Sequence, residues 1–342
     1  MGKTIEFKIK HGDISSFEAD VVALKYAQNF FGADKYIAQL LNDAGISYDD
    51  MRPKIGENVF IDTRNRIDAP YALFVGVQSL WKFGYQEIRE FSANVLTTLL
   101  KKTPQVKHLA MTIHGPGYGL DEVEALLAQF AGCLQVIQDE NAPPNLEYIS
   151  IVELNLERVK RLRMGFEENI IGLGNIFRVK NRWAYQLEVP QKFNFTTRKS
   201  SLISSPVETA GTKSETKPHV FVAMPFRKDM EDVFYYGIQS AAHKNDLLCE
   251  RIDQEGFTGD ILDRIKKKIE TASVVIAELT GANPNVYLEV GYAWGKGIPT
   301  ILLVKNSEEV CFDVRGHKYL RYEIIKELEL SLTKELRSLW QK

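Results

Sequence analysis

Hydrophobic and polar positions follow two alternating periods in the first half of the chain. Residues 4–10 alternate apolar and polar side chains, which predicts a strand with one buried face. Apolar runs predict further strands at Val21–Leu24, Val59–Asp62, Tyr71–Val77, Leu109–Ile113 and Tyr148–Glu153. Helical spacing predicts helices at Asp34–Ala44, Gln86–Lys102, Asp121–Gln138 and Leu156–Phe166. Strands that alternate with helices predict an α/β fold with a mainly parallel sheet covered by helices.

The same alternation resumes near the C-terminus. Strands are predicted at Val220–Ala223, Leu247–Ile252, Val274–Ile276, Thr300–Val304 and Tyr319–Tyr322. Helices are predicted at Glu231–Lys244, Ile261–Thr271, from Asn285 or Val286 to Gly297, and from Ile324 to about Leu339. The short connections between these repeats predict a flavodoxin-like, doubly wound parallel sheet.

The region between these two patterns has a different composition. Residues 178–189 are compatible with a short hairpin, whereas residues 194–217 are dominated by Ser, Thr, Lys and Glu, which is typical of a linker. A chain of 342 residues is long enough for two domains. We therefore expect an α/β protein with an N-terminal domain at 1–169, a linker at 170–217 and a C-terminal domain at 218–342.

The charge balance and the cysteines indicate which ligands and macromolecules the protein is expected to bind. The 43 Lys and Arg residues nearly balance the 45 Asp and Glu residues, so neither direct nucleic-acid binding nor membrane binding is expected. No secretory signal is recognisable and no apolar run approaches the roughly 20 residues of a membrane helix, which favours a cytoplasmic protein. Cys133, Cys249 and Cys311 lack metal-ligand spacing and are expected to be reduced thiols. We expect neither a metal nor a cofactor, and we expect the protein to form a homo-oligomer.

A glycine-rich segment joins the strand ending at Ile113 to the following helix. It reads His114-Gly115-Pro116-Gly117-Tyr118-Gly119, and the glycines let the backbone turn tightly and bring its N–H groups close to an anion. The N-terminus of a helix follows, so a phosphate could bind here. A simple strand-to-helix turn without a ligand is the alternative, and the loop alone does not decide between the two.

Two segments of this domain together resemble the macro domain family. They are Gly12-Asp13-Ile14, followed by Ala19-Asp20-Val21-Val22, and the later Gly117-Tyr118-Gly119. The resemblance implies that Asp13 contacts adenine and that the loop wraps the diphosphate of an ADP-ribose-like nucleotide. The segment Lys25–Gly32 lacks the asparagine and the glycine run of that family, so the resemblance implies binding rather than hydrolysis. The expected signal-binding residues are Asp13, Gly115, Gly117, Tyr118 and Gly119.

In the C-terminal domain, polar and aromatic residues follow the predicted strands. Because parallel strands direct these segments to one edge of the sheet, we expect them to line a common cleft. The segments are Met224-Pro225-Phe226, Arg251 with Asp253, Glu278–Asn285, and Glu289 in the helix that follows. A carboxylate in such a cleft can attack an anomeric carbon or stabilise an oxocarbenium-like cation, which points to glycosidic cleavage. Glu289 near the helix N-terminus is expected to be ionised at neutral pH.

Each of these residues also has a structural interpretation. Glu289 could be an exposed helix residue. Its apolar neighbours, Val286 to Leu288 and Val290, instead favour a position at a buried edge. Asp253 could simply cap the loop before the next helix. Arg251 could serve only as the partner of a nearby carboxylate.

One segment of this domain resembles the nucleoside 2-deoxyribosyltransferase family and related TIR-like effector domains of bacterial immunity. It reads Asn283-Pro284-Asn285-Val286-Tyr287-Leu288-Glu289-Val290-Gly291-Tyr292-Ala293 and is followed by Gly297-Ile298-Pro299. The resemblance implies that Glu289 is the nucleophile on the sugar. Asn283-Pro284-Asn285 replaces the Asp-Asp-Gly of the transferases, which favours a leaving base that is already cationic, such as nicotinamide in NAD. The expected catalytic residues are Glu289, Asp253 and Asn285. The expected substrate-binding residues are Met224, Pro225, Phe226, Arg251, Asn283, Tyr287 and Tyr292.

Two classes of function fit these features. The first is an N-glycosidase that cleaves the ribosyl–base bond of NAD or a nucleotide, gated by a nucleotide in the N-terminal domain; the family resemblance points to antiphage defence. The second is a non-enzymatic nucleotide-binding or signalling module. A nucleoside deoxyribosyltransferase of nucleotide salvage is a further alternative within the first class.

Overall fold

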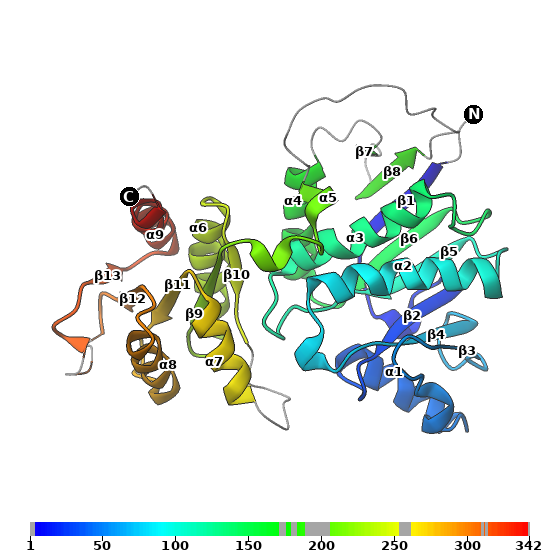
Figure 1. Ribbon diagram of the computed structural model, residues 1–342, viewed down its shortest axis with the longest axis horizontal. Helices are drawn as coiled ribbons and strands as arrows, with labels where there is room; N and C mark the ends of the chain where they lie inside the picture. Colours follow the sequence, from blue (N-terminus) through cyan, green and yellow to red (C-terminus); the bar gives the residue numbers. More distant parts are fainter. Residues whose placement is uncertain are drawn as a thin grey trace. The chain divides into compact units, whose positions relative to one another are not determined.

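The computed structural model describes residues 4–170, 176–178, 183–188, 206–252, 261–308, 311 and 314–340. The chain divides into two compact units (Figure 1). The first comprises Met1–Gly115 and Glu122–Ser214, and the second comprises Pro116–Asp121 and Glu215–Lys342. Both units are α/β, which confirms the predicted fold class.

The first unit is built on an eight-stranded sheet of order β3-β4-β2-β5-β6-β1-β8-β7 among the described residues. Its strands are β1 (Thr4–His11), β2 (Val21–Tyr26), β3 (Asn58–Asp62), β4 (Tyr71–Gly76), β5 (His108–Thr112), β6 (Tyr148–Glu153), β7 (Ile176–Arg178) and β8 (Ala184–Glu188). The five central strands run parallel, as the alternation with helices predicts. β3 pairs antiparallel with β4, and β8 pairs antiparallel with both β1 and β7, so the hairpin expected near residues 178–189 extends this sheet.

Helices cover both faces of this sheet (Figure 1). They are α1 (Gly32–Asp43), α2 (Tyr85–Lys102), α3 (Glu122–Gln138), α4 (Leu156–Ile170) and the short α5 (Pro206–Thr209). α1 buries Ile37 and Leu41 against one face. On the other face, the ring of Phe7 in β1 lies 4.8 Å from that of Phe130 in α3 and 5.4 Å from that of Phe166 in α4. The first unit is therefore a three-layer α/β structure.

The second unit contains five parallel strands in the order β10-β9-β11-β12-β13. They are β9 (His219–Ala223), β10 (Leu248–Glu250), β11 (Val274–Glu278), β12 (Thr300–Lys305) and β13 (Tyr319–Tyr322). Renumbered within the unit, this order is 2-1-3-4-5, the flavodoxin-like order that the sequence predicts. The strands β9 and β11 are buried along their whole length, because helices cover both faces of the sheet.

Two apolar cores lie on opposite faces of this second sheet. One contains residues of η6 (Val233–Gln239), α6 (Ser240–His243) and α9 (Ile325–Trp340). The other contains residues of α7 (Ile261–Thr271) and α8 (Pro284–Gly295). The helix predicted at 231–244 differs from expectation in one respect, because η6 is a π-helix. Two neighbouring residues of η6, Phe234 and Tyr235, have their ring centroids 4.1 and 6.0 Å from the guanidinium carbon of Arg251.

Candidate functional site at the carboxyl edge of the second sheet

The second sheet has a topological switch point between β9 and β11. The chain leaving β9 enters η6 and α6 on one face, whereas the chain leaving β11 enters α8 on the other. The two connections therefore diverge at the carboxyl edge, which is where open α/β sheets bind their ligands. Most of the candidate substrate and catalytic residues belong to segments that begin at this edge.

An arginine and three apolar groups come together on one side of this edge. Met224 and Pro225 are buried directly after β9, and Phe226 is half-buried. The Arg251 guanidinium carbon lies 4.1 Å from the Phe234 ring centroid and 5.1 Å from that of Phe226. Its Nη1 lies 3.8 Å from the sulfur of Met224. These contacts hold the cation against aromatic faces, so its orientation is restricted before any ligand binds.

The start of α8 is capped by an asparagine. The side-chain oxygen of Asn283 accepts a hydrogen bond of 2.9 Å from the N–H of Asn285. Pro284 occupies the first helical position, where a missing N–H costs nothing. The helix thus begins at Pro284, one or two residues before the predicted start at Asn285 or Val286, and the Asn285 side chain is exposed.

The spacing of residues in α8 places the candidates on two different flanks. Asn285, Glu289 and Tyr292 follow each other at four and three residues and therefore share one flank. The Tyr292 hydroxyl donates to Glu270 of α7 at 2.6 Å, so this flank faces α7. Tyr287 lies on the other flank, where its hydroxyl accepts a hydrogen bond of 3.4 Å from Cys311 N. The structure therefore brings Asn285 and Glu289 to one side of the helix and leaves Tyr287 on the other.

Glu289 is a half-buried carboxyl group without a hydrogen bond or ion pair to any other residue that the structure describes. Burial raises its pKa from the usual 4.5 to about 7. Glu289 is therefore only partly ionised at neutral pH, whereas the sequence led us to expect an ionised group. The physical reason is that Glu289 lies in the second turn of α8, beyond the first turn to which the favourable helix dipole is confined.

Asp253, the other carboxylate proposed for catalysis, lies outside the described residues. A second buried carboxyl group lies at the end of β11, in the segment Glu278–Asn285 that was expected to line the cleft, although it was not singled out for catalysis. Glu278 is fully buried, and it accepts hydrogen bonds from the Thr280 hydroxyl and, at 3.0 Å, from the Tyr322 hydroxyl. Burial raises its pKa. A single glutamate at the end of the apolar run Val274–Ala277 was the available sequence signal for this group.

The residues expected to bind a signal nucleotide divide between the two units. Asp13 and Gly115 belong to the first unit, whereas Gly117, Tyr118 and Gly119 belong to the second. The Asp13 carboxylate accepts 2.8 Å hydrogen bonds from the N–H and the hydroxyl of Ser15. The three glycines have φ angles of 104°, 81° and 90°, a region that disfavours any residue with a side chain. The tight turn inferred from the glycines is thus present.

A buried histidine precedes this loop in the first unit. Neither ring nitrogen of His114 has a hydrogen-bond partner among the described residues, and its ring lies 4.7 Å from that of Phe91 in an edge-to-face contact. Burial, followed by the charge of Lys25, lowers its pKa well below 6.5, so the imidazole is neutral. The sequence offered no spacing that would have singled out this residue.

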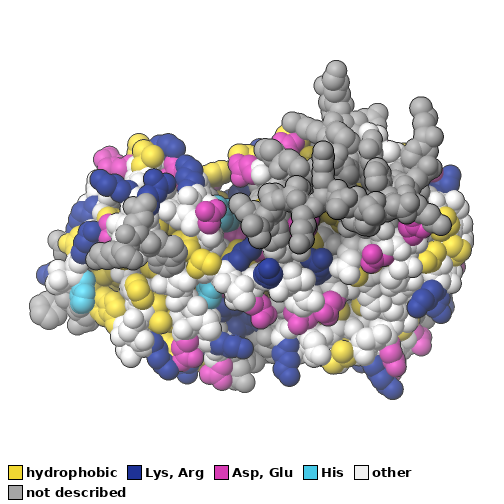
Figure 2. Space-filling model, turned by 45° about the horizontal axis from the view of Figure 1, so that its top comes forward, with side chains coloured by type: hydrophobic (Ala, Val, Ile, Leu, Met, Phe, Trp, Pro, Cys, Tyr) yellow, Lys and Arg dark blue, Asp and Glu magenta, His cyan; other side chains and the backbone are white. Residues whose placement is uncertain are grey.

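Charged side chains of both signs lie on the described surface. On the face shown in Figure 2, Lys and Arg side chains are interspersed with Asp and Glu side chains. Among the described helices, none combines the length and the apolar character needed to cross a membrane. In the same part of the chain, no three His, Cys, Asp or Glu side chains are grouped as metal ligands would be.

Comparison with known proteins finds similarity in structure but none in sequence. No protein-family model matches the chain, and no curated protein matches it in sequence. A macrodomain from Oceanobacillus iheyensis is 13% identical, with a TM-score of 0.36, covering 50% of this chain and 98% of its own. A Trypanosoma brucei macrodomain solved with ADP is 12% identical, with a TM-score of 0.37, covering 48% and 68%.

The CMP N-glycosidase from Clostridium botulinum is also similar in structure. It is 22% identical, with a TM-score of 0.29, and the match covers 34% of this chain and 98% of that protein. About half of the chain is thus similar to macrodomain structures. None of these TM-scores reaches 0.5, so the function proposed below is argued from the residues themselves.

Proposed function

We propose that the second unit is an N-glycosidase that cleaves the ribosyl–base bond of NAD or of a nucleotide. The main support for this proposal is the burial, the raised pKa and the position of the Glu289 carboxyl group. It is a half-buried carboxyl group with a pKa raised to about 7, with no partner among the described residues, on the helix that follows the switch point of the sheet. Strongly perturbed carboxyl groups in such places are characteristic of catalytic acids, bases and nucleophiles.

The ionised Glu289 carboxylate attacks the anomeric carbon of the ribose as the carbon–nitrogen bond breaks. The base leaves with the bonding electron pair, and the sugar is held as an ester on Glu289. Nicotinamide in NAD is cationic and leaves as a neutral base, so no proton donor is needed. Water then hydrolyses the ester, which restores the carboxylate. Attack by a second free base instead of water would give the transferase reaction from the same intermediate.

The remaining candidates have roles that suit this chemistry. Asn285 shares the flank of Glu289 and supplies an amide for the sugar hydroxyls. The Arg251 guanidinium, held against Phe226 and Phe234, can pair with a phosphate of the substrate. Asp253 remains the alternative nucleophile. Three further residues, Asn283, Tyr287 and Tyr292, remain proposed substrate contacts, and each of them already forms a hydrogen bond within the protein.

We further propose that an ADP-ribose-like nucleotide, bound by Asp13 and the loop from Gly115 to Gly119, regulates this activity. The positive φ angles of the three glycines leave the backbone free of side chains, as close approach to a diphosphate requires. The antiphage role implied by the sequence resemblance stays a prediction, as does the homo-oligomeric state.

The decisive test is incubation of the purified full-length chain with NAD and a panel of nucleosides and nucleotides, with chromatographic detection of the released base. Glu289→Gln is compared with Glu231→Gln, which changes an exposed glutamate of the same unit. Base release that Glu289→Gln abolishes and Glu231→Gln retains supports the enzyme. Binding without any base release, with and without ADP-ribose, would instead identify a non-enzymatic nucleotide-binding module.

A further inference from the structure

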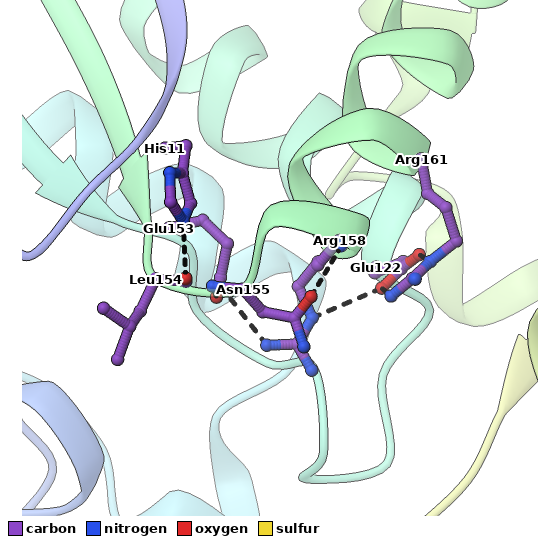
Figure 3. Close-up of polar contacts among 7 residues, drawn as sticks. All are labelled: His11, Glu122, Glu153, Leu154, Asn155, Arg158 and Arg161. Atoms are coloured by element: carbon purple, nitrogen blue, oxygen red, sulfur yellow. Dashed lines mark hydrogen bonds and ion pairs between the residues drawn. The ribbon is translucent and has the colours of Figure 1, made fainter. Parts of the chain in front are cut away.

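Two adjacent buried carboxylates anchor the chain in different units. Glu122 at the start of α3 belongs to the first unit, where it accepts hydrogen bonds of 2.7 and 3.2 Å from the guanidinium of Arg161 (Figure 3). It also forms an ion pair of 3.4 Å with Arg158. Asp121, one residue earlier, is equally buried but belongs to the second unit. Two neighbouring residues thus have their partners in different units.

Asp121 completes the edge of the second sheet. β10 is an edge strand, so one side of its backbone has no neighbouring strand among the residues that the structure describes. The Asp121 carboxylate accepts a hydrogen bond of 2.9 Å from the N–H of Cys249 in this strand. The same oxygen accepts one of 2.6 Å from Nε2 of His243. An aspartate here satisfies a buried backbone donor that would otherwise lack a partner in the sheet.

Tyr118 and Gly119 contact the chain just beyond β10. Tyr118 forms an antiparallel bridge with Ile252, and its carbonyl oxygen accepts a hydrogen bond of 2.6 Å from Nη2 of Arg264 in α7. A side chain at Gly119 would place its Cβ 3.0 Å from Cγ1 of Ile252, at a φ of +90°. Only glycine lets the loop approach Ile252 this closely without strain.

We propose that Pro116–Asp121 is a positioning element for Arg251. Arg251 lies between Cys249, which Asp121 holds, and Ile252, which Tyr118 holds, so one loop fixes the backbone on both sides of it. The proposal rests on the proposed function, in which Arg251 binds a substrate phosphate. A ligand that displaces this loop alters the position of the guanidinium.

The test uses the full-length chain in three variants. Asp121→Asn keeps the shape of the side chain and removes its charge, and Gly119→Ala strains the loop against Ile252. Glu122→Gln is the matched control, since it alters a neighbouring buried carboxylate that acts only within the first unit. Two quantities are measured: amide hydrogen exchange of residues 248–252, and KM and kcat for NAD.

We expect Asp121→Asn and Gly119→Ala each to accelerate exchange of residues 248–252 and to raise KM for NAD about tenfold, with kcat changed by less than about threefold. Glu122→Gln should leave both quantities at wild-type values. Wild-type exchange and KM in Asp121→Asn would overturn the proposal. Faster amide hydrogen exchange throughout β11 in both loop variants would also overturn the proposal, because the loop would then stabilise the whole second unit rather than position Arg251. If wild-type protein does not cleave NAD, the enzyme assignment for NAD fails, and the exchange measurement alone decides the positioning role.

Discussion

Replacing Glu289 by glutamine should stabilise the second unit at alkaline pH. The pKa of this carboxyl group is about 7 in the folded protein, against 4.5 for an ordinary glutamate. Since one pKa unit corresponds to about 1.4 kcal/mol, the difference between these two pKa values means that ionising Glu289 costs the folded state at most about 3.5 kcal/mol. A folded pKa raised above the unfolded value means that wild-type stability falls as pH rises from about 4.5 to about 7 and is constant above that.

The glutamine variant has no charge to bury and does not suffer this loss. We therefore expect Glu289→Gln to be more stable than wild type by up to about 3.5 kcal/mol at pH 8, and to match it near pH 4. The same substitution should lower turnover by at least about a hundredfold, equivalent to about 2.7 kcal/mol of transition-state stabilisation. Greater stability combined with lost activity is the signature of a destabilised catalytic group.

Chemical denaturation followed between pH 4 and pH 8 measures the first effect, with Glu231→Gln as the exposed control. Steady-state base release over the same range measures the second. Because the carboxylate is the attacking form, wild-type kcat should rise with pH through about 7. A stability difference between Glu289→Gln and wild type that does not change with pH would refute the burial argument. A folded variant with near-normal turnover would show that the nucleophile is another residue, with Asp253 the next candidate.

Three further predictions concern helix α3, the glycine-rich loop and the region before α5. Gly132→Ala should destabilise the first unit by about 2 kcal/mol or more in chemical denaturation, because its Cβ would lie 2.1 Å from the carbonyl oxygen of Arg89 in α2. Gly117→Val should weaken calorimetric binding of ADP-ribose without unfolding the second unit, since its φ of 81° admits no β-branched residue; unchanged affinity would count against the signal site. Limited proteolysis should cut the stretch between Asn194 and Lys217. We expect the cut on the N-terminal side of α5, because Val207 in this helix is buried; resistance of the stretch to protease would contradict the proposed boundary.

The strands and helices could be predicted because each buries a face whose period is visible in the sequence. In the second unit, runs such as Val274–Ile276 and Thr300–Val304 are apolar throughout, as strands covered by helices on both faces must be. Their order with the intervening helices was enough to predict the flavodoxin-like arrangement. The π-helix η6 was not predicted, since its pattern of apolar residues differs little from that of an α-helix.

The candidate site was less predictable, because its properties depend on three-dimensional surroundings. Tyr287 and Tyr292 are similar in sequence context, yet α8 directs one toward Cys311 and the other toward Glu270. Position near a helix N-terminus suggested an ionised Glu289, whereas burial, which no local pattern reports, raises its pKa to about 7. The sequence could thus nominate the residue but not its protonation state.

Asp121 and Glu122 illustrate the same limit at the junction of the two units. In the sequence they are two consecutive acidic residues at the start of a helix, and the general expectation is that both stabilise its N-terminus. In the structure Glu122 pairs with Arg161, 39 residues further along the chain, and Asp121 binds the backbone of Cys249, 128 residues further along. Both partners are non-local, so neither is encoded in the spacing around residue 121. The loop that looks like a ligand-binding turn in the sequence is thereby also part of the second unit, where Asp121 binds the edge strand β10.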